Sequence, residues 1–300
     1  MRTSSSLAAL ALPLALACTA DHDVTPPGLA PPSCTMTYQT YRIDELRLPE
    51  TNAEANLLGL DLDHRPSDNS AGVDNILGVS HVTMIALTTA WNVNPAIAGH
   101  LAAGRLQWAL RLGQCADGAE IRVELVQAAD GDGDGRLELL AAGLASVGTA
   151  GPRIATRDGA GMVPVGFLTD GQGDLATDAW QLGLGLASEL TVDPDGALTG
   201  KVGVGIGRLT DLALAPIAAY ASTALADPGG VGDYWRTQDR DRDGVISPAE
   251  VRAFFEAIAA PDLDLGDCDQ LDCYLLDDQD RTNDHVSLGL GVHAVPVETE

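Results

Sequence analysis

The chain has 300 residues, a hydrophobic fraction of 45% and a formal net charge of −26 at pH 7. This length and apolar content allow one large core or two modest ones. A surface this acidic repels phosphates and anionic lipid headgroups, which argues against nucleic acid as a partner and favours divalent cations. The charge alone fits simple solubility equally well. The spacing of the acidic residues therefore has to distinguish cation binding from solubility.

The first 17 residues predict an export signal. Arg2 supplies a positive charge, and the apolar stretch 7–17 is much shorter than the roughly 20 residues of a membrane-spanning helix. The small residues before Cys18 resemble a bacterial lipobox, and this resemblance implies cleavage before Cys18 and lipidation of its sulfur. Ordinary signal-peptidase cleavage after Ala17 is the alternative. We therefore expect an exported protein, either anchored to the cell envelope as a lipoprotein or secreted.

Residues 18–33 contain four prolines and predict a flexible tether. No boundary divides residues 34–300, so we expect a single domain, with residues 231–260 as a candidate subdomain. If Cys18 is lipidated, four cysteines remain, and an even number in an oxidising compartment predicts two disulfides. Cys268 and Cys273 are close enough in sequence to close a small loop, which leaves Cys34 to pair with Cys115. Zinc is the competing interpretation, but no CxxC pair or histidine cluster accompanies these cysteines.

The first half of the domain is predicted to mix strands and helices. Residues 35–48 have an extended pattern. Helices are predicted over 73–88 and 94–103, the second with an Asn-Pro pair as its start signal. Alternating apolar residues then predict strands that begin near Leu106 and Ile121.

The clearest β signal is a hairpin over residues 182–206. Apolar residues alternate on both sides of the sequence Asp-Pro-Asp-Gly at 193–196, whose residue types suit a turn. Glycines occupy the opposite face of both strands and of a C-terminal strand over 286–292. Such a smooth face lets a helix or a second sheet approach closely, although compositional bias would explain the glycines as well. A further helix is predicted over 209–225.

Residues 239–250 carry acidic residues at the spacing of a calcium loop. The three aspartates at positions 1, 3 and 5 alternate, so their carboxylates turn toward one centre, and Gly244 at position 6 permits the sharp turn. Glu250 at position 12 would close the site with two oxygens. The complete set of candidate ligands is Asp239, Asp241, Asp243, Val245 through its carbonyl, Ser247 directly or through water, and Glu250.

A helix is predicted directly after this loop. Ser247, Pro248 and Glu250 form a capping box with a proline at the first helical position, and apolar residues then line one helix face. Over residues 231–260 the sequence resembles the EF-hand calcium-binding family. The resemblance implies a calcium ion bound at 239–250, between a short entering helix and this exiting helix. The alternative is a solvated turn before an ordinary helix.

A second acidic stretch, 130–138, repeats the first half of the pattern. Position 12 is Ala141, so the bidentate glutamate is missing, and Glu138 would replace it only with a different geometry. The stretch lies between strand-like segments, which suits a calcium-bound β-turn or an acidic solvated hairpin. Its weaker candidate ligands are Asp130, Asp132, Asp134, Arg136 and Glu138. Two further stretches, 61–75 and 262–284, are rich in Asp, and we expect at least one ion in the second.

Catalytic motifs are missing from the sequence. The six histidines show no HExxH spacing, and no GxSxG, phosphate-binding loop or GxGxxG precedes a helix. About seven or eight strands and four helices without regular alternation predict an α+β fold, mainly antiparallel β in a sandwich-like sheet, with peripheral helices and the EF-hand-like loop-helix.

We therefore expect an exported calcium-binding protein, surface-anchored and non-enzymatic, in which calcium rigidifies acidic loops. Extracellular calcium is plentiful, so a site with a dissociation constant on the order of 10⁻⁴–10⁻³ M would stay occupied. The alternative is an extracellular hydrolase, for example one acting on glycans through an unidentified pair of carboxylates. The sequence leaves any protein partner open.

Overall fold

The computed structural model describes residues 31–62, 73–87, 92–104, 106–118, 120–130, 134–139, 143–149, 153–164, 181–206, 211–226, 231–259, 262–263 and 286–299. The helices in these ranges are α1 (Asn52–Leu58), α2 (Ile76–Leu87), α3 (Asn94–Ala102), α4 (Asp211–Ala224), α5 (Val231–Gln238) and α6 (Pro248–Ile258). The strands are β1 (Met36–Arg47), β2 (Trp108–Cys115), β3 (Ile121–Ala129), β4 (Glu138–Leu139), β5 (Leu144–Thr149), β6 (Ile154–Pro164), β7 (Gln181–Val192), β8 (Leu198–Ile206) and β9 (Val286–Val297).

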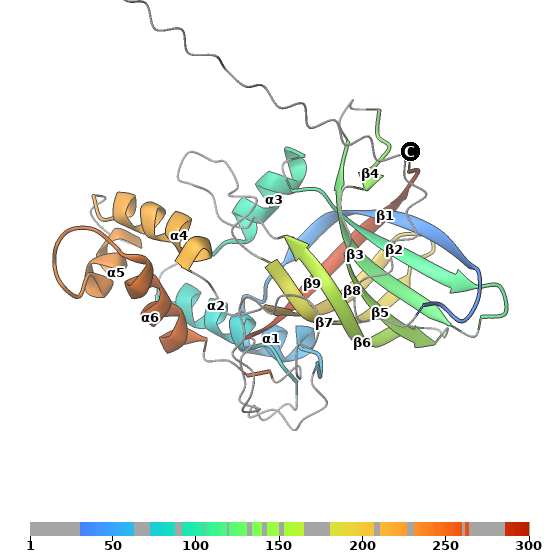
Figure 1. Cartoon of the computed structure of the whole chain (residues 1–300), viewed down its shortest axis with the longest axis horizontal. Helices are drawn as coiled ribbons and strands as arrows, with labels where there is room; N and C mark the ends of the chain where they lie inside the picture. The colour runs from blue at the N-terminus through green and yellow to red at the C-terminus, as the bar shows by residue number, and fades with distance from the viewer. Residues whose placement is uncertain are drawn as a thin grey trace, which may run out of the picture.

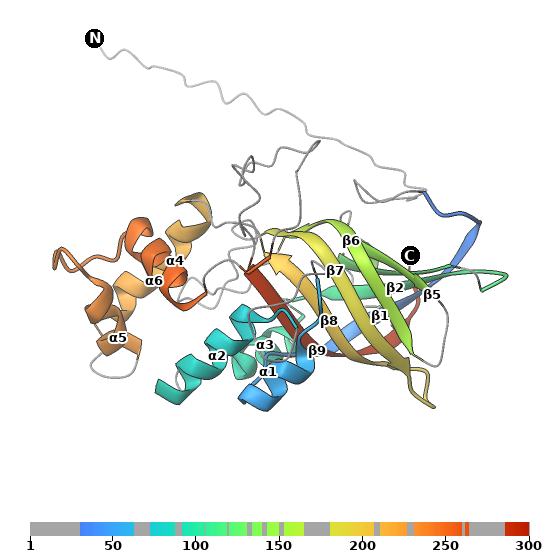
Figure 2. The same cartoon turned by 90° about the horizontal axis from the view of Figure 1, so that it is seen from below.

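Eight of the strands close into an antiparallel β-barrel (Figures 1 and 2). The order β2-β1-β9-β8-β7-β6-β5-β3 returns to its start because β2 also pairs with β3, and the short β4 extends from β3. The predicted sandwich-like sheet is therefore wrong. An alternating strand has one buried face in a sandwich and in a barrel. The pattern therefore does not tell whether that face packs against a second sheet or against the opposite wall of the same barrel.

Apolar residues of β1, β2, β3, β6, β7, β8 and β9 form one buried core inside the barrel. Leu110 of β2 lies opposite Tyr41 of β1 and Leu125 of β3, and all three belong to one buried core. A row of hydroxyls crosses this interior: Thr156 Oγ1 lies 2.6 Å from Ser146 Oγ and 2.7 Å from Ser188 Oγ. Because these hydroxyls bond one another, they remain buried without an unpaired polar group.

The glycines on the outer face of β8 and β9 allow a segment of the chain to lie directly against the barrel. A Cβ atom built on Gly203 would lie 3.1 Å from the side chain of Leu60, and one on Gly289 would lie 2.3 Å from the Leu58 carbonyl oxygen. Asn75 fastens this layer, since its side chain donates to Ala55 O and accepts from Gly289 N, both at 2.8 Å. The predicted role of the glycine face is confirmed at these positions.

The predicted hairpin is confirmed as β7 and β8. Its turn is closed by a hydrogen bond from Asp193 N to Ala197 O (2.8 Å), and Gly196 takes a φ of 87°. The helices predicted over 73–88, 94–103 and 209–225 correspond to α2, α3 and α4. Asn94 does not cap α3 as expected. Its side chain instead accepts from Leu48 N (2.8 Å) and donates to Leu48 O (3.0 Å), which ties α3 to the end of β1.

A disulfide joins Cys34 to Cys115 with a Cα–Cα distance of 5.9 Å, which confirms this predicted pair. It links the start of β1 to the end of β2, strands that are already hydrogen-bonded neighbours. The predicted signal peptide 1–17, Cys18, residues 18–30 of the predicted tether, and the second cysteine pair, Cys268 and Cys273, lie outside the described residues.

Helices α4, α5 and α6 form a separate unit, called the helical unit below, which lies to one side of the barrel in both views (Figures 1 and 2). Its core contains Leu214, Ala218, Ala221, Trp235, Ile246, Val251 and Phe254, and Met84 of α2 joins it. None of the helices in the described ranges combines the length and the apolar character needed to cross a membrane.

Candidate metal centre

The loop at 239–250 is held between α5 and α6. Helix α5 ends where the Asp239 N–H donates to the Trp235 carbonyl (3.1 Å). The ring of Trp235 is buried and packs edge-on against Phe254 of α6, with centroids 5.1 Å apart. This aromatic contact packs α5 against α6, the two helices that carry the loop.

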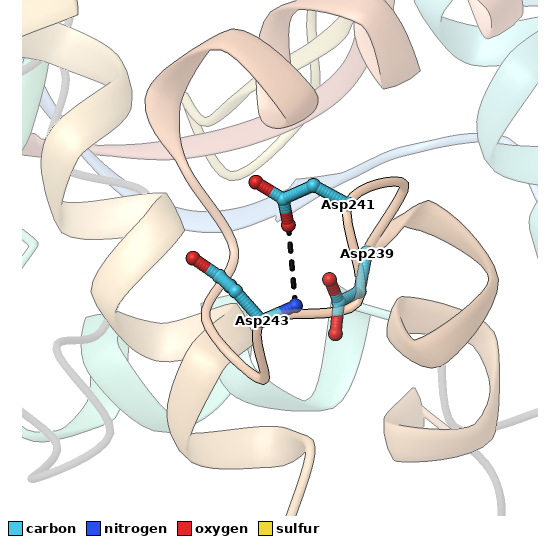
Figure 3. A group of neighbouring side chains, drawn as sticks. All are labelled: Asp239, Asp241 and Asp243. Carbon is cyan, nitrogen blue, oxygen red and sulfur yellow. Dashed lines mark hydrogen bonds between the residues drawn. The ribbon is translucent and has the colours of Figure 1, made fainter.

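The structure brings the three alternating aspartates together. One carboxylate oxygen from each of Asp239, Asp241 and Asp243 lies within 4.8 Å of the others, and Figure 3 shows the three side chains within a single turn of the chain. The same carboxylates organise the backbone: Asp241 Oδ1 accepts from Asp243 N (3.2 Å), and Asp243 Oδ1 accepts from Val245 N (2.8 Å). Gly244 takes a φ of 80°, as its place in the pattern requires.

Asp239 carries the most informative atom of the loop. Its Oδ2 accepts from Gly244 N (3.1 Å), whereas its Oδ1 is shielded from solvent and has no hydrogen-bond partner among the described residues. A buried carboxylate oxygen without a partner is costly, and three carboxylates at this separation also repel one another. A hard cation would remove both penalties, because it binds such oxygens directly. The residues present therefore fit a bound calcium ion.

Glu250 is buried and bridges the two ends of the loop. Its Oε2 accepts from Ser247 N and Ser247 Oγ, both at 2.9 Å, and its Oε1 accepts from Arg240 N at 2.7 Å. Burial alone would raise the pKa of Glu250, but these hydrogen bonds outweigh it and hold the pKa below the ordinary value. The predicted capping box and the proline at the start of α6 are confirmed. Glu250 is not one of the three clustered carboxylates, so its two-oxygen coordination stays a prediction.

The second loop repeats the local structure of the first. Asp130 Oδ2 accepts from Gly135 N (3.2 Å), and Asp134 Oδ1 accepts from Arg136 N (2.8 Å). Asp130 Oδ1, like Asp239 Oδ1, is shielded from solvent and has no hydrogen-bond partner within the part of the chain that the structure describes. Asp132 lies outside the described residues, and Glu138 is exposed in β4. The described part of this loop therefore reproduces the first half of the calcium pattern but not its closure by a capping glutamate.

Two described aspartates of the remaining acidic stretches, Asp74 and Asp262, serve the fold. Asp74 is buried and accepts from Leu62 N (2.7 Å). Asp262 accepts from Ser287 N (2.8 Å) and from the Ser287 hydroxyl, and burial raises its pKa. Most other acidic residues of these stretches lie outside the described residues.

Two buried charged groups were missed by the alternation pattern, which places Arg122 and Glu124 on the solvent side of β3. Both are buried on the outer wall of the barrel, where Glu124 Oε2 accepts from Arg111 Nη1 (2.8 Å) and Arg122 donates to Glu120 (2.9 Å). Burial raises the pKa of Glu124, although the charge of Arg111 opposes this. Ser222 of α4 was also missed, because its partner in the 239–250 loop, Ile246, lies 24 residues later in the chain.

The site is a helix–loop–helix that gathers three carboxylates and is chemically suited to a hard divalent cation. No protein-family model matches the sequence, and neither a curated protein nor a solved structure is detectably similar to it. The function is therefore inferred from the geometry of the loop.

Proposed function

We propose that this chain is an exported calcium-binding protein in which calcium at 239–250 fastens α5 to α6. The observation that carries the proposal is the cluster of Asp239, Asp241 and Asp243 within 4.8 Å, with the buried, unpartnered Oδ1 of Asp239 at its side. The resemblance of residues 231–260 to the EF-hand family, which includes the helix after the loop, also supports it.

The oxygen count of the loop suits calcium. Calcium takes six to eight oxygens. The three aspartates, the Val245 carbonyl, Ser247 or a water, and two oxygens of Glu250 would supply that number. Glu250 already crosses the loop to Arg240 N, so it would reach the ion by a local rearrangement. The loop at 130–138 is a second, weaker site. It is supported by hydrogen bonds within this loop that match those within the first loop.

The proposed role is structural. Calcium neutralises carboxylates that otherwise repel one another and thereby rigidifies the loop. A dissociation constant on the order of 10⁻⁴–10⁻³ M is enough outside the cell. Calcium at about ten times the dissociation constant stabilises the folded chain by about 1.4 kcal/mol.

The proposal includes export and a lipid anchor at Cys18, supported by the apolar stretch and the small residues that precede it. Cys18→Ala should release the protein from the membrane fraction. An unchanged distribution between membrane and soluble fractions would rule out the anchor and leave secretion.

Calorimetric titration with calcium tests the proposed function. We expect the parent protein to bind calcium and Asp239→Asn to bind at least about tenfold more weakly, since a charged ligand is lost. Glu256→Gln is the matched control, because it removes one charge from an exposed position of α6. A parent without binding heat, or equal affinities for parent and Asp239→Asn, would contradict the proposal.

A further inference from the structure

Ser222 of α4 holds the backbone of the calcium loop. Its Oγ accepts a hydrogen bond from Ile246 N at 2.8 Å. The same hydroxyl donates to Ala218 O at 2.8 Å, with Ile246 O at 3.3 Å as a longer alternative acceptor. A single side chain of α4 is thus bonded to the one residue that separates Val245 from Ser247.

The position of this bond matters because of the two neighbours of Ile246. Val245 offers the carbonyl that would bind the ion, and Ser247 caps α6 together with Glu250. The side chain of Ile246 is buried in the core of the helical unit with 2% exposure, so its backbone has little freedom to find another partner. The orientation of the peptide groups on both sides of Ile246 therefore depends on Ser222.

We infer that Ser222 is a positioning residue of the cation loop and that, through it, ion binding and the docking of α4 stabilise each other. The inference rests on the proposed function at 239–250. Coupling of this kind is reciprocal: if the docked α4 raises the calcium affinity, calcium must protect α4 by the same factor. Ser222 has no direct contact with the ion in this scheme and acts only by fixing the backbone at 246.

A purely structural role for Ser222 predicts something different. The hydroxyl would then only help α4 to pack, and its loss would destabilise the chain equally with and without calcium, with an unchanged dissociation constant. The chain offers a matched control in the next residue, Thr223, whose hydroxyl makes the same kind of bond to Ala219 O (3.0 Å) but is exposed. Ala is the best helix former, so Ser222→Ala keeps α4 helical.

The test measures calcium affinity by calorimetry and amide exchange in α4 for four proteins: the parent, Ser222→Ala, Ser222→Thr and Thr223→Ala. We expect Ser222→Ala to raise the dissociation constant about tenfold, within the range seen when a group that orients a ligand is removed. Ser222→Thr keeps the hydroxyl and should restore most of the affinity, and Thr223→Ala should match the parent. Calcium should slow amide exchange in α4 in the parent and much less in Ser222→Ala.

Two outcomes overturn the inference separately from the proposed function. A parent that binds calcium while Ser222→Ala binds equally well would overturn the role of Ser222 and leave the site intact. An equal loss in Ser222→Ala and Thr223→Ala would do the same, since it would show a general effect on α4. A parent that binds no calcium would overturn both the proposed function and this inference.

Discussion

The barrel and the helical unit each carry an acidic loop, and the two loops differ in the segment that each of them leads into. Both loops begin with an aspartate that accepts from a glycine N–H and leaves its other oxygen buried without a partner. After 243 the chain turns into α6, where Glu250 returns to the start of the loop. After 134 the chain enters the short β4, where Glu138 is exposed. The first half of the pattern therefore sets the turn. The second half determines whether a glutamate returns to the start of the loop and closes it.

The barrel and the helical unit also differ in how they are stabilised. The barrel is closed by a ring of hydrogen-bonded strands, and the disulfide between Cys34 and Cys115 joins two of them. The helical unit depends on a small core with packed rings at Tyr234, Trp235 and Phe254. A calcium ion should therefore matter more to the helical unit than to the barrel.

Removal of the disulfide is expected to have the largest effect and to be confined to the barrel. The crosslink spans 81 residues of sequence. The double change Cys34→Ser and Cys115→Ser should lower the free energy of unfolding by about 4 kcal/mol, as loop-closure entropy predicts. Urea unfolding measures this change, and calorimetry should find the calcium affinity of the 239–250 loop unaltered. A large loss of affinity would mean that the two regions are not independent.

The two loops should respond unequally to the same change in their first aspartate. Asp239→Asn should weaken the tighter calcium site by at least about tenfold, equivalent to about 1.4 kcal/mol. Asp130→Asn should leave that site unchanged and remove only weaker binding, because its loop lacks a capping glutamate. The stoichiometry and affinities from calorimetry distinguish the two variants. The comparison is wrong if Asp130→Asn reduces the tighter binding.

The smallest expected effect is a pH-dependent contribution to the stability of the barrel. The Nδ1 atom of His293 in β9 lies 2.5 Å from Oδ1 of Asp44, which is the residue at the register shift of β1. This hydrogen bond raises the pKa of His293. A raised pKa means that protonated His293 stabilises the fold fully below its ordinary pKa near 6.5 and that this stability is lost as pH rises through the higher folded value. Both groups are substantially exposed, so Asp44→Asn should cost only about 0.5 kcal/mol.

Thermal unfolding of parent and Asp44→Asn at pH 5.5 and pH 8.5 measures this contribution. The variant should be less stable than the parent at pH 5.5, and the difference should shrink at pH 8.5. A difference that grows with pH would contradict the assignment. Calcium binding at 239–250 should be the same in both proteins at each pH.

Much of the fold was predictable because its signals are local. Apolar patterning located β1, β2, β3 and β9, the Asp-Pro-Asp-Gly turn located the β7–β8 hairpin, and glycines marked the wall on which Leu58 and Leu60 lie, whereas β4, β5 and β6 were not placed. Barrel closure was not predictable, because β1 pairs with β9 from the other end of the chain and with β2 beyond three helices. Burial of Arg122 and Glu124 was missed for a related reason, since alternation assumes that the outer face of a strand is solvated.

The loop at 239–250 was predictable to the same extent. The spacing of Asp239, Asp241 and Asp243 and the capping box at Ser247 are local patterns, and the structure shows the cluster and the cap that they predict. Ser222 was not predictable, because a serine in a helix gives no sign of the segment that its hydroxyl will bind. The same limit applies to every contact between distant segments that uses a common polar side chain.

The most direct test of the account compares Glu250→Gln with Glu250→Ala. Gln keeps an oxygen that accepts from Ser247 and so largely retains the cap of α6, whereas Ala removes both the cap and the predicted calcium ligand. Both variants should lose calcium binding at 239–250 in calorimetric titrations. Without calcium, Glu250→Ala should be about 1 kcal/mol less stable than Glu250→Gln, because only Ala removes the cap of α6. If Glu250→Gln binds calcium with the parent's affinity, the ion is not bound at 239–250, the loop is a solvated turn and the proposed site is wrong.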